Sequence, residues 1–360
     1  MDKGRRVNSG HFAARTIEQG PKISANSALR CPLRVRAKKS ISVTVLLLVS
    51  LLVICAPTAG SCTETGGRAL ILGGGGPVGE AWESGVIAGL MEKGVDLSRA
   101  DLIIGTSAGA IVGARLASRM PRSDFIAAAI AWPDGSPARE QPDQTSSSPP
   151  PDLSFLAAKL QEMGAGKGSQ ESIRAEIGKW AQKVRPVVSE SQFVASYKRR
   201  FPETDWPRQA FECTSVEAAD GSLRVWNGSS GVPLAVAVAS SCALPGLFAP
   251  VMIDGRQYMD GGVRSVTNAD LARGCETALV LAPTKGSNDE LAKRFTRPLS
   301  GELRILQDSG CKVELIVPDP RSLEAFGPTL GAVNHRAPAF DAGRVEGRSE
   351  AGKIVNLWID

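Results

Sequence analysis

Short apolar runs alternate with longer stretches of helical periodicity along the chain after residue 67. Short runs of apolar residues bounded by glycine or polar residues are typical of buried strands, and they predict strands at 68–72, 101–104, 277–282 and 312–317. Apolar residues that recur every three or four positions predict helices at 80–93, 110–118, 120–131, 153–163, 170–184, 189–200, 232–241, 288–307 and 339–352. Turn residues between shorter strands predict hairpins at 209–227 and 251–259. This order predicts an α/β fold with a mainly parallel central sheet.

The first 61 residues differ in composition from the rest of the chain. Residues 1–40 are basic, contain Ser and Gly and show no periodicity, which predicts an unstructured leader. Residues 41–61 carry no charge and begin with an apolar run of 15 residues that ends at Cys55. A run of that length is short for a membrane span and is typical of the apolar core of a signal peptide. Two alternatives stay open. The protein is exported and cleaved after this segment, or the apolar run is retained as a membrane anchor.

The seven cysteines are compatible with an exported protein. Cys62 follows the small residues 59–61, which loosely resembles the sequence in which a cysteine of bacterial lipoproteins is lipidated, so lipidation of Cys62 is a hypothesis. Cys275 and Cys311 each follow a glycine at the start of a predicted strand. If these strands are neighbours, a Cys275–Cys311 disulfide is expected, with two buried free thiols as the alternative. No Cys or His group has metal-ligand spacing, so we predict no metal.

The net charge of +5 comes from the leader alone. Residues 1–40 hold ten Lys or Arg and two Asp or Glu, a net of +8, which leaves −3 for the remainder. A mildly acidic folded part has no basic surface of the kind that binds nucleic acid, so no nucleic-acid partner is expected. With 360 residues and 42% apolar content, the chain can bury the core of one large α/β domain or of two small ones.

The sequence Gly105-Thr106-Ser107-Ala108-Gly109 joins a predicted strand to a predicted helix. Gly-x-Ser-x-Gly in that context is typical of a catalytic serine on a sharp turn. The small residues allow the turn to lift the hydroxyl above the sheet, and a helix N-terminus favours negative charge beside it. We therefore predict Ser107 as a nucleophile, with Gly105 and Gly109 shaping its turn.

A second glycine-rich stretch follows the first predicted strand directly. Its backbone can present successive N–H groups to an anionic oxygen, so this glycine loop is a candidate oxyanion hole for the nucleophile. The spacing Gly74-x-Gly76-x-x-Gly79 also matches a dinucleotide-binding fingerprint, but no acidic residue closes the second strand as that fingerprint requires. A phosphate-binding P-loop would need Gly-Lys-Ser/Thr at the end of the stretch, which is absent. A purely structural glycine turn is the remaining alternative.

A nucleophilic serine needs a base. Asp260 is followed by Gly261 and Gly262 at the end of a predicted strand, which leaves its carboxylate at a turn near a neighbouring loop. An Asp-Gly turn alone is usually only a turn. The alternative base is His335, the one histidine outside the leader, which would act in a Ser-His-Asp triad. We favour a carboxylate that acts directly on Ser107, because burial in an apolar cleft would raise its pKa from roughly 4 toward neutrality.

The glycine-rich loop, the Gly-x-Ser-x-Gly turn and the Asp-Gly-Gly turn follow one another along the chain in an order that resembles the patatin-like phospholipase family. The resemblance rests on residues 73–79, 105–109, 243–251 and 260–262. It extends over residues 67–320 and implies a three-layer α/β/α sandwich, a Ser107–Asp260 dyad and oxyanion donors at 74–76. It also implies hydrolysis of acyl esters of lipids through a covalent acyl-enzyme, without a cofactor.

One position departs from the family pattern, since the basic residue that usually precedes the last glycine of the loop is Val78 here. This departure is expected to shift the preference toward neutral esters or to lower activity. Within the predicted catalytic domain, 67–320, residues 133–200 form a loop and a helical insertion, and residues 321–360 are expected to pack on the domain as a C-terminal extension.

The sequence thus predicts an exported or envelope-anchored serine acyl hydrolase of the lipase or phospholipase type. Its expected partners are a lipid or acyl-ester substrate and a membrane surface. Two other functions stay open, which are a non-catalytic envelope lipid-binding protein and a dinucleotide-binding protein.

Overall fold

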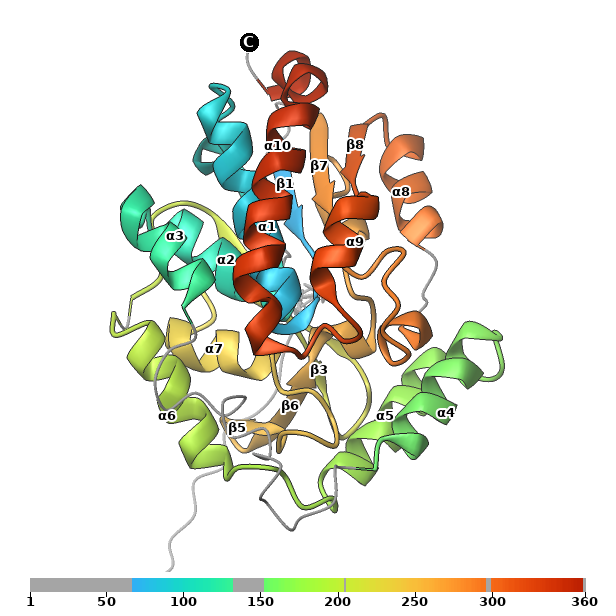
Figure 1. The fold of residues 1–360 in the computed structure, drawn as a ribbon. Helices are drawn as coiled ribbons and strands as arrows, with labels where there is room; N and C mark the ends of the chain where they lie inside the picture. Colours follow the sequence, from blue (N-terminus) through green and yellow to red (C-terminus); the bar gives the residue numbers. More distant parts are fainter. Residues whose placement is uncertain (1–66, 132–151, 204, 296–298, 359–360) are drawn as a thin grey trace, which may run out of the picture. The chain divides into compact units, whose positions relative to one another are not determined.

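The computed structural model describes residues 67–131, 152–203, 205–295 and 299–358 (Figure 1). The predicted leader, the predicted signal or anchor segment, Cys62 and the loop at 133–151 lie outside the described residues. The chain divides into two units, residues 1–54 and 55–360, and every described residue belongs to the second unit.

A single eight-stranded sheet forms the centre of this unit. Its strands are β1 (Arg68–Leu72), β2 (Leu102–Gly105), β3 (Phe211–Glu217), β4 (Leu223–Trp226), β5 (Val251–Ile253), β6 (Arg256–Asp260), β7 (Thr277–Leu281) and β8 (Lys312–Ile316). They lie in the order β5-β6-β3-β2-β1-β7-β8, and β4 pairs with β3. The pairs from β3 through β2, β1 and β7 to β8 are parallel, whereas β4, β5 and β6 are joined by antiparallel pairs. The predicted α/β fold with a mainly parallel sheet is confirmed.

The described helices follow the predicted order closely. They are α1 (Gly76–Glu92), α2 (Ala108–Ala117), α3 (Arg122–Ile130), α4 (Ser154–Gly164), α5 (Gln170–Ala181), α6 (Glu190–Arg200), α7 (Leu234–Ser241), α8 (Leu299–Asp308), α9 (Pro320–Phe326) and α10 (Arg336–Trp358). The predicted helix at 288–307 is wrong over its first half. There the Asp289 carboxylate accepts from the N–H groups of Leu291 and Ala292 and closes only a short 3₁₀ turn, and α8 begins at Leu299.

The two faces of the sheet are covered by different helices, which gives three layers. Leu70 and Leu72 of β1 point into a core shared with α1, α2, α7 and α10, whereas Ala69 and Ile71 point into a second core with α8. Side chains on a strand alternate between its faces, so an unbroken apolar run is buried on both sides. In Figure 1, α1, α9 and α10 lie in front of β1 and β7. The predicted α/β/α sandwich is confirmed.

The C-terminal helix α10 packs closely along α1. A Cβ atom added at Gly85 would lie 2.2 Å from the Phe340 carbonyl oxygen, and one added at Gly89 would lie 2.2 Å from the Arg344 carbonyl oxygen. Glycine at these positions of α1 therefore lets the two helix backbones approach each other. Along the described part of the chain, no helix combines the length and apolar character that a membrane crossing requires.

The predicted Cys275–Cys311 disulfide is wrong. Cys275 is disulfide-bonded, but Cys311 is a buried free thiol, as are Cys213 and Cys242. The two predicted strands are indeed parallel neighbours, but Thr277 of β7 pairs with Lys312 of β8. The two cysteines are therefore out of register by one residue, which the similarity of their flanking sequences did not reveal.

Candidate active site

The predicted nucleophile and the glycine-rich loop leave the sheet side by side. Leu72, the last residue of β1, pairs in register with Gly105, the last residue of β2. Because the two strands are parallel, the loops that follow them lie at the same edge of the sheet. The Gly109 N–H donates to the Gly73 carbonyl oxygen at 3.0 Å, which ties the serine turn to the glycine loop.

Ser107 occupies a strained turn between β2 and α2. Its φ of 53° and ψ of −114° lie in a region that residues with a side chain rarely adopt. A Cβ atom at Gly105 would lie 2.5 Å from the Gly109 carbonyl oxygen, and one at Gly109 would lie 2.0 Å from the Leu72 carbonyl oxygen. Both glycines of the motif are therefore required by close backbone contacts, and the turn presents Ser107 at the N-terminus of α2.

Asp260 ends β6 and lies beside the serine turn. The residue is 4% exposed, and its Oδ1 accepts from the Gly262 N–H at 2.7 Å. The Ser107 side chain lies close enough to stabilise the charged form of the same carboxylate. Gly261 has no room for a side chain, because a Cβ atom there would lie 2.2 Å from the Thr214 Oγ1 of β3. The structure thus brings Ser107 and Asp260 together, and the two glycines after Asp260 hold its turn.

Burial sets the proton affinity of Asp260. Desolvation raises its pKa from the ordinary 3.8 to about 7, although the Gly262 N–H and the Ser107 hydroxyl both stabilise the charged form. A carboxyl group with this pKa can take up and release a proton near neutral pH.

The glycine loop offers two of the three expected oxyanion donors. The Gly74 N–H donates to the Val266 carbonyl oxygen at 2.6 Å and is therefore occupied, which corrects the prediction for Gly74. Gly75 and Gly76 line the same cleft as Ser107, and within the described residues their N–H groups donate no hydrogen bond. These two amides can therefore receive a developing negative charge.

The cleft over the dyad is mostly apolar. Its volume is about 420 Å³, and Ser107 and Asp260 line it together with Gly75 and Gly76. The apolar side chains that line it come from several helices and loops, and they include Leu153, Phe193, Leu244, Leu247, Phe248, Leu291 and Phe295. Phe193 and Phe248 stack with ring centroids 4.3 Å apart. Such a lining suits an acyl chain and excludes water from the carboxyl group.

A buried ion-pair cluster contributes Glu80 and Arg200 to the lining of the cleft. Glu80 Oε1 accepts from Arg115 at 2.8 Å and from Arg336 at 3.0 Å, and Arg200 lies 3.9 Å from Oε2. Burial would raise the pKa of Glu80, but Arg336, Arg115 and Arg200 outweigh it and hold the pKa at about 2. Burial raises the pKa of the neighbouring Glu83 well above its ordinary range, and its carboxyl group accepts from the Gly73 N–H at 2.8 Å.

Asn268 connects the turns that carry both members of the dyad. It is fully buried in a left-handed conformation, with φ of 48°. Its side-chain amide donates to the Ser265 carbonyl oxygen at 2.6 Å and also lies within hydrogen-bond range of Thr106 Oγ1 at 3.1 Å, Thr214 Oγ1 at 3.2 Å and the Gly261 carbonyl oxygen at 3.4 Å. Because Thr106 precedes the nucleophile and Gly261 follows the base, this one amide fixes the two turns relative to each other.

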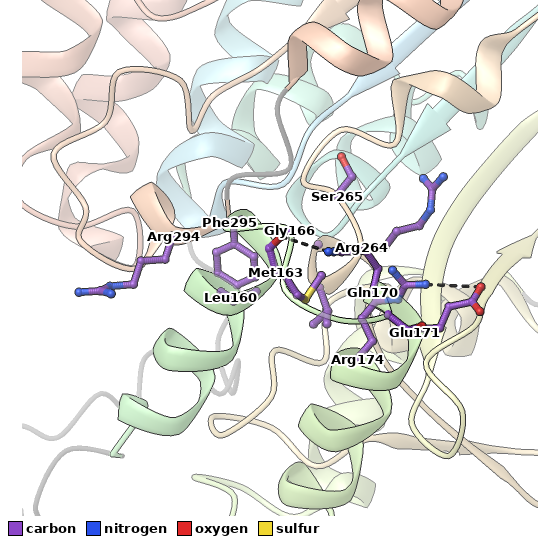
Figure 2. Close-up of a pocket in the computed structure, with 14 residues that line it drawn as sticks. Leu160, Met163, Gly166, Gln170, Glu171, Arg174, Arg264, Ser265, Arg294 and Phe295 are labelled. Atoms are coloured by element: carbon purple, nitrogen blue, oxygen red, sulfur yellow. Dashed lines mark hydrogen bonds and ion pairs between the residues drawn. The ribbon is translucent and has the colours of Figure 1, made fainter.

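A second cavity of about 630 Å³ is lined by residues of α4 and α5 and by the turn that follows Asp260 (Figure 2). Arg264 lines it and donates to Asn268 Oδ1 at 2.6 Å and to Asp270 Oδ1 at 3.0 Å. Figure 2 shows Arg174 beside Glu171 in the same wall. The guanidinium of Arg264 thus orients the Asn268 side chain.

The key residues of the two alternative sites, His335 for a triad and Asp101 for dinucleotide binding, do not line the cleft. His335 Nδ1 lies 2.9 Å from the Ala325 carbonyl oxygen, and His335 is not among the residues that line the cleft. Asp101, the acidic residue of the second strand, lies at its amino end and accepts from the Arg68 N–H at 2.8 Å, far along the strand from the glycine loop. In the described part of the chain, no group of three His, Cys, Asp or Glu side chains could hold a metal ion.

Sequence reasoning missed Asn268, Ser241 and the Glu80 cluster. The Ser107 N–H donates to Ser241 Oγ at 3.0 Å. A pair of serines at the end of the apolar helix α7 was a usable signal for Ser241, because polar residues at buried positions need a partner. Asn268 and Glu80 had no local signal, because their partners are distant in the sequence.

Comparison with known proteins gives one family match. The sequence model described as "Patatin-like phospholipase" matches residues 70–273, which is more than half of the chain. No curated protein matches the sequence. Among solved structures, VipD from Legionella pneumophila is similar with a TM-score of 0.41 and 14% identity, over 80% of this chain and 67% of that one. The type III effector protein ExoU is similar with a TM-score of 0.33 and 14% identity, over 79% of this chain and 53% of that one, so this chain spans about half of its length.

Proposed function

Because this chain belongs to the patatin-like phospholipase family, whose members are lipid acyl hydrolases, we propose that it hydrolyses acyl esters through a Ser107–Asp260 dyad. The buried Asp260 carboxylate, whose charged form the Ser107 side chain stabilises in the same cleft, carries this proposal. An unactivated serine is a weak nucleophile, and a base within hydrogen-bond reach is what activates it.

In the first half of the reaction, Ser107 Oγ attacks the ester carbonyl carbon while its proton moves to Asp260. The carbonyl oxygen becomes an oxyanion, which the N–H groups of Gly75 and Gly76 and the N-terminus of α2 stabilise. The tetrahedral intermediate collapses, the bond to the alcohol oxygen breaks, and the alcohol leaves with the proton from Asp260. The acyl group is then bound to Ser107.

In the second half, water attacks the acyl-enzyme while Asp260 accepts a proton from it. The intermediate collapses to a free carboxylic acid, and Ser107 Oγ regains its proton. A pKa of about 7 suits both steps, because Asp260 acts once as base and once as acid in each half.

A lipid substrate is consistent with the apolar lining of the cleft, and we extend the proposal to a substrate drawn from a membrane surface. Export or anchoring to the cell envelope stays a proposal based on residues 41–61 and Cys62. Both segments lie outside the described residues.

A fluorophosphonate probe tests the dyad. We expect the probe to modify Ser107 covalently in the full chain, with the adduct located by peptide mass spectrometry. Labelling and ester turnover should be lost in Ser107→Ala and in Asp260→Asn. The matched controls are Ser118→Ala, which changes an exposed serine at the other end of α2, and Asp254→Asn, which changes an exposed carboxylate on the β5–β6 hairpin.

Retention of turnover in Asp260→Asn would refute the dyad. A folded protein that binds lipid vesicles but neither reacts with the probe nor hydrolyses esters would instead support the non-catalytic lipid-binding alternative.

A further inference from the structure

Residues 241–243, at the end of α7, lie directly against the nucleophile. The Ser107 N–H donates to Ser241 Oγ at 3.0 Å. The thiol of the next residue, Cys242, donates to the Ser107 carbonyl oxygen at 3.2 Å. Two consecutive side chains therefore hold the peptide groups on both sides of the Ser107 Cα atom.

The same short segment also holds the base. The Asp260 N–H donates to the Ala243 carbonyl oxygen at 3.0 Å. The groups that hold the backbones of Ser107 and Asp260 are therefore only two residues apart, on Ser241 and Ala243. The position of the nucleophile relative to its base depends on this one segment, to which the hydrolysis mechanism has so far given no role.

The 241–243 segment rests on a buried part of α7. Residues 237–241 of this helix are fully buried, and the first three of them belong to the main hydrophobic core. The Cys242 and Ala243 N–H groups continue the hydrogen bonding of the helix, at 3.0 and 3.3 Å from carbonyl oxygens within it. A close-packed interior leaves little room for movement, so the segment is a firm support for the residues that it contacts.

Of the two contacts with Ser107, the one from Ser241 has no substitute. The Ser107 carbonyl oxygen also accepts from the Ala110 and Ile111 N–H groups, at 2.9 and 3.3 Å, so it stays bonded without the Cys242 thiol. The Ser107 N–H, in contrast, has Ser241 Oγ as its one hydrogen-bond partner within the described residues. The φ of Ser107, 53°, is strained, and a strained backbone persists only where its surroundings fix it.

We propose that Ser241 is a positioning residue of the dyad, whose hydroxyl fixes the strained backbone of Ser107 and thereby holds the nucleophile against Asp260. This inference rests on the proposed Ser107–Asp260 dyad. Ser241 is not among the described residues that line the cleft, so it acts through Ser107 and not on the substrate. Its loss should therefore lower kcat, whereas KM should change little.

Ser240 offers a matched control. Both serines are fully buried in the last turn of α7. The Ser240 hydroxyl lies 2.7 Å from Ser215 Oγ and donates to the Ala237 carbonyl oxygen at 2.8 Å, and neither bond involves the dyad. Ser240→Ala and Ser241→Ala each remove one buried hydroxyl group from the same turn, so the urea midpoint of unfolding should fall by similar amounts.

Steady-state kinetics with monomeric 1,2-dihexanoylglycerol separates positioning from a general structural role. We expect kcat to fall at least about tenfold in Ser241→Ala with KM little changed, because small displacements of a reacting group are costly. Ser240→Ala should keep a kcat near that of the wild type, and Ser241→Thr, which retains the hydroxyl group, should recover part of the loss. Equal kcat values in the two alanine variants, or a loss that appears in KM alone, would overturn the inference.

Amide hydrogen exchange separates this inference from the proposed function, because it requires no turnover. The Ser107 N–H is bonded to a buried hydroxyl group, so mass spectrometry of peptides that contain Ser107 should show faster exchange in Ser241→Ala than in Ser240→Ala. If the wild type hydrolyses no ester but this difference is found, the catalytic proposal fails and the role of Ser241 in holding the serine turn stands. Equal exchange in the two variants would refute that role, even in an enzyme whose dyad is confirmed.

Discussion

The ionisation of Asp260 should govern the pH dependence of turnover. As the base in the first step, Asp260 must be ionised, and burial raises its pKa to about 7. At pH 6 about a tenth of the molecules then carry the ionised carboxylate, and at pH 8 about nine tenths do. We therefore expect kcat/KM to rise about tenfold from pH 6 to pH 8, with an inflection near pH 7. A carboxyl group with the ordinary pKa of 3.8 would be ionised throughout this range, and the profile would be flat.

The assay should use a substrate that does not itself titrate. Hexanoate released from monomeric 1,2-dihexanoylglycerol, measured by mass spectrometry between pH 5 and pH 9, meets this condition. Asp254→Asn is the matched control, because it removes an exposed carboxylate near Asp260 in sequence and should leave the inflection in place.

Another buried group must be separated from Asp260 in this experiment. Burial also raises the pKa of Glu83, which accepts from the Gly73 N–H beside the oxyanion loop. Glu83→Gln should keep the inflection near pH 7. A flat profile from pH 6 to pH 8 in the wild type, or an inflection that disappears in Glu83→Gln, would refute the assignment of Asp260 as the titrating base. The Cys242 thiol does not compete, because burial raises its pKa far above this range.

Three further substitutions test the architecture around the dyad. Gly109→Ala places a Cβ atom 2.0 Å from the Leu72 carbonyl oxygen, so it should lower the free energy of unfolding in urea by about 3 kcal/mol. Asn268→Ala removes the amide that joins the two catalytic turns, and we expect kcat to fall at least about tenfold with little change in KM, as measured by steady-state kinetics. Glu80→Gln leaves buried guanidinium groups without their carboxylate and should cost about 3–5 kcal/mol at pH 7. Since the pKa of Glu80 is lowered to about 2, its contribution is present above pH 4.5 and is lost as the pH falls toward 2, so the two proteins should converge in stability in acid.

The sequence predicted those parts of the fold that depend on residues close together in the chain. The strands β1, β2, β7 and β8 are continuous apolar runs, because both faces of the sheet are covered, and each lies within two residues of its predicted bounds. The serine turn was recognisable for a similar reason. Its glycines are enforced by contacts with residues close by in the chain or on the adjacent strand.

The features that the sequence did not predict depend on pairings between distant segments. The Gly74 N–H was expected to face the oxyanion, but Val266, nearly 200 residues away, supplies the carbonyl oxygen that occupies it. The disulfide prediction failed because strand register is fixed by whole-sheet packing, and similar flanking residues at Cys275 and Cys311 carry no information about it. Asn268 is an ordinary turn residue in sequence, and its role follows only from the buried hydroxyl groups that surround it.

Ionisation of the Asp260 carboxylate should also lower the stability of the folded protein. The dependence of stability on pH therefore gives a second, independent measurement of the pKa of Asp260. A carboxyl group whose pKa is raised in the native state binds its proton more tightly when folded than when unfolded, so folding is favoured below pH 3.8 and this contribution is lost as the pH rises to 7. Between those values the full loss is about 4 kcal/mol, and the part that falls between pH 5 and pH 8 is about 2–3 kcal/mol.

Asparagine at position 260 cannot ionise, so the difference in stability between Asp260→Asn and the wild type should grow by about 2–3 kcal/mol in favour of the variant from pH 5 to pH 8. Urea unfolding of both proteins at the two pH values measures this difference, and other titrating groups cancel between them. The inactive variant should therefore gain stability relative to the wild type as the pH rises. An unchanged difference would mean that the Asp260 carboxylate is already ionised in the folded protein at pH 5. That result would refute both the raised pKa of Asp260 and the expected inflection of kcat/KM near pH 7.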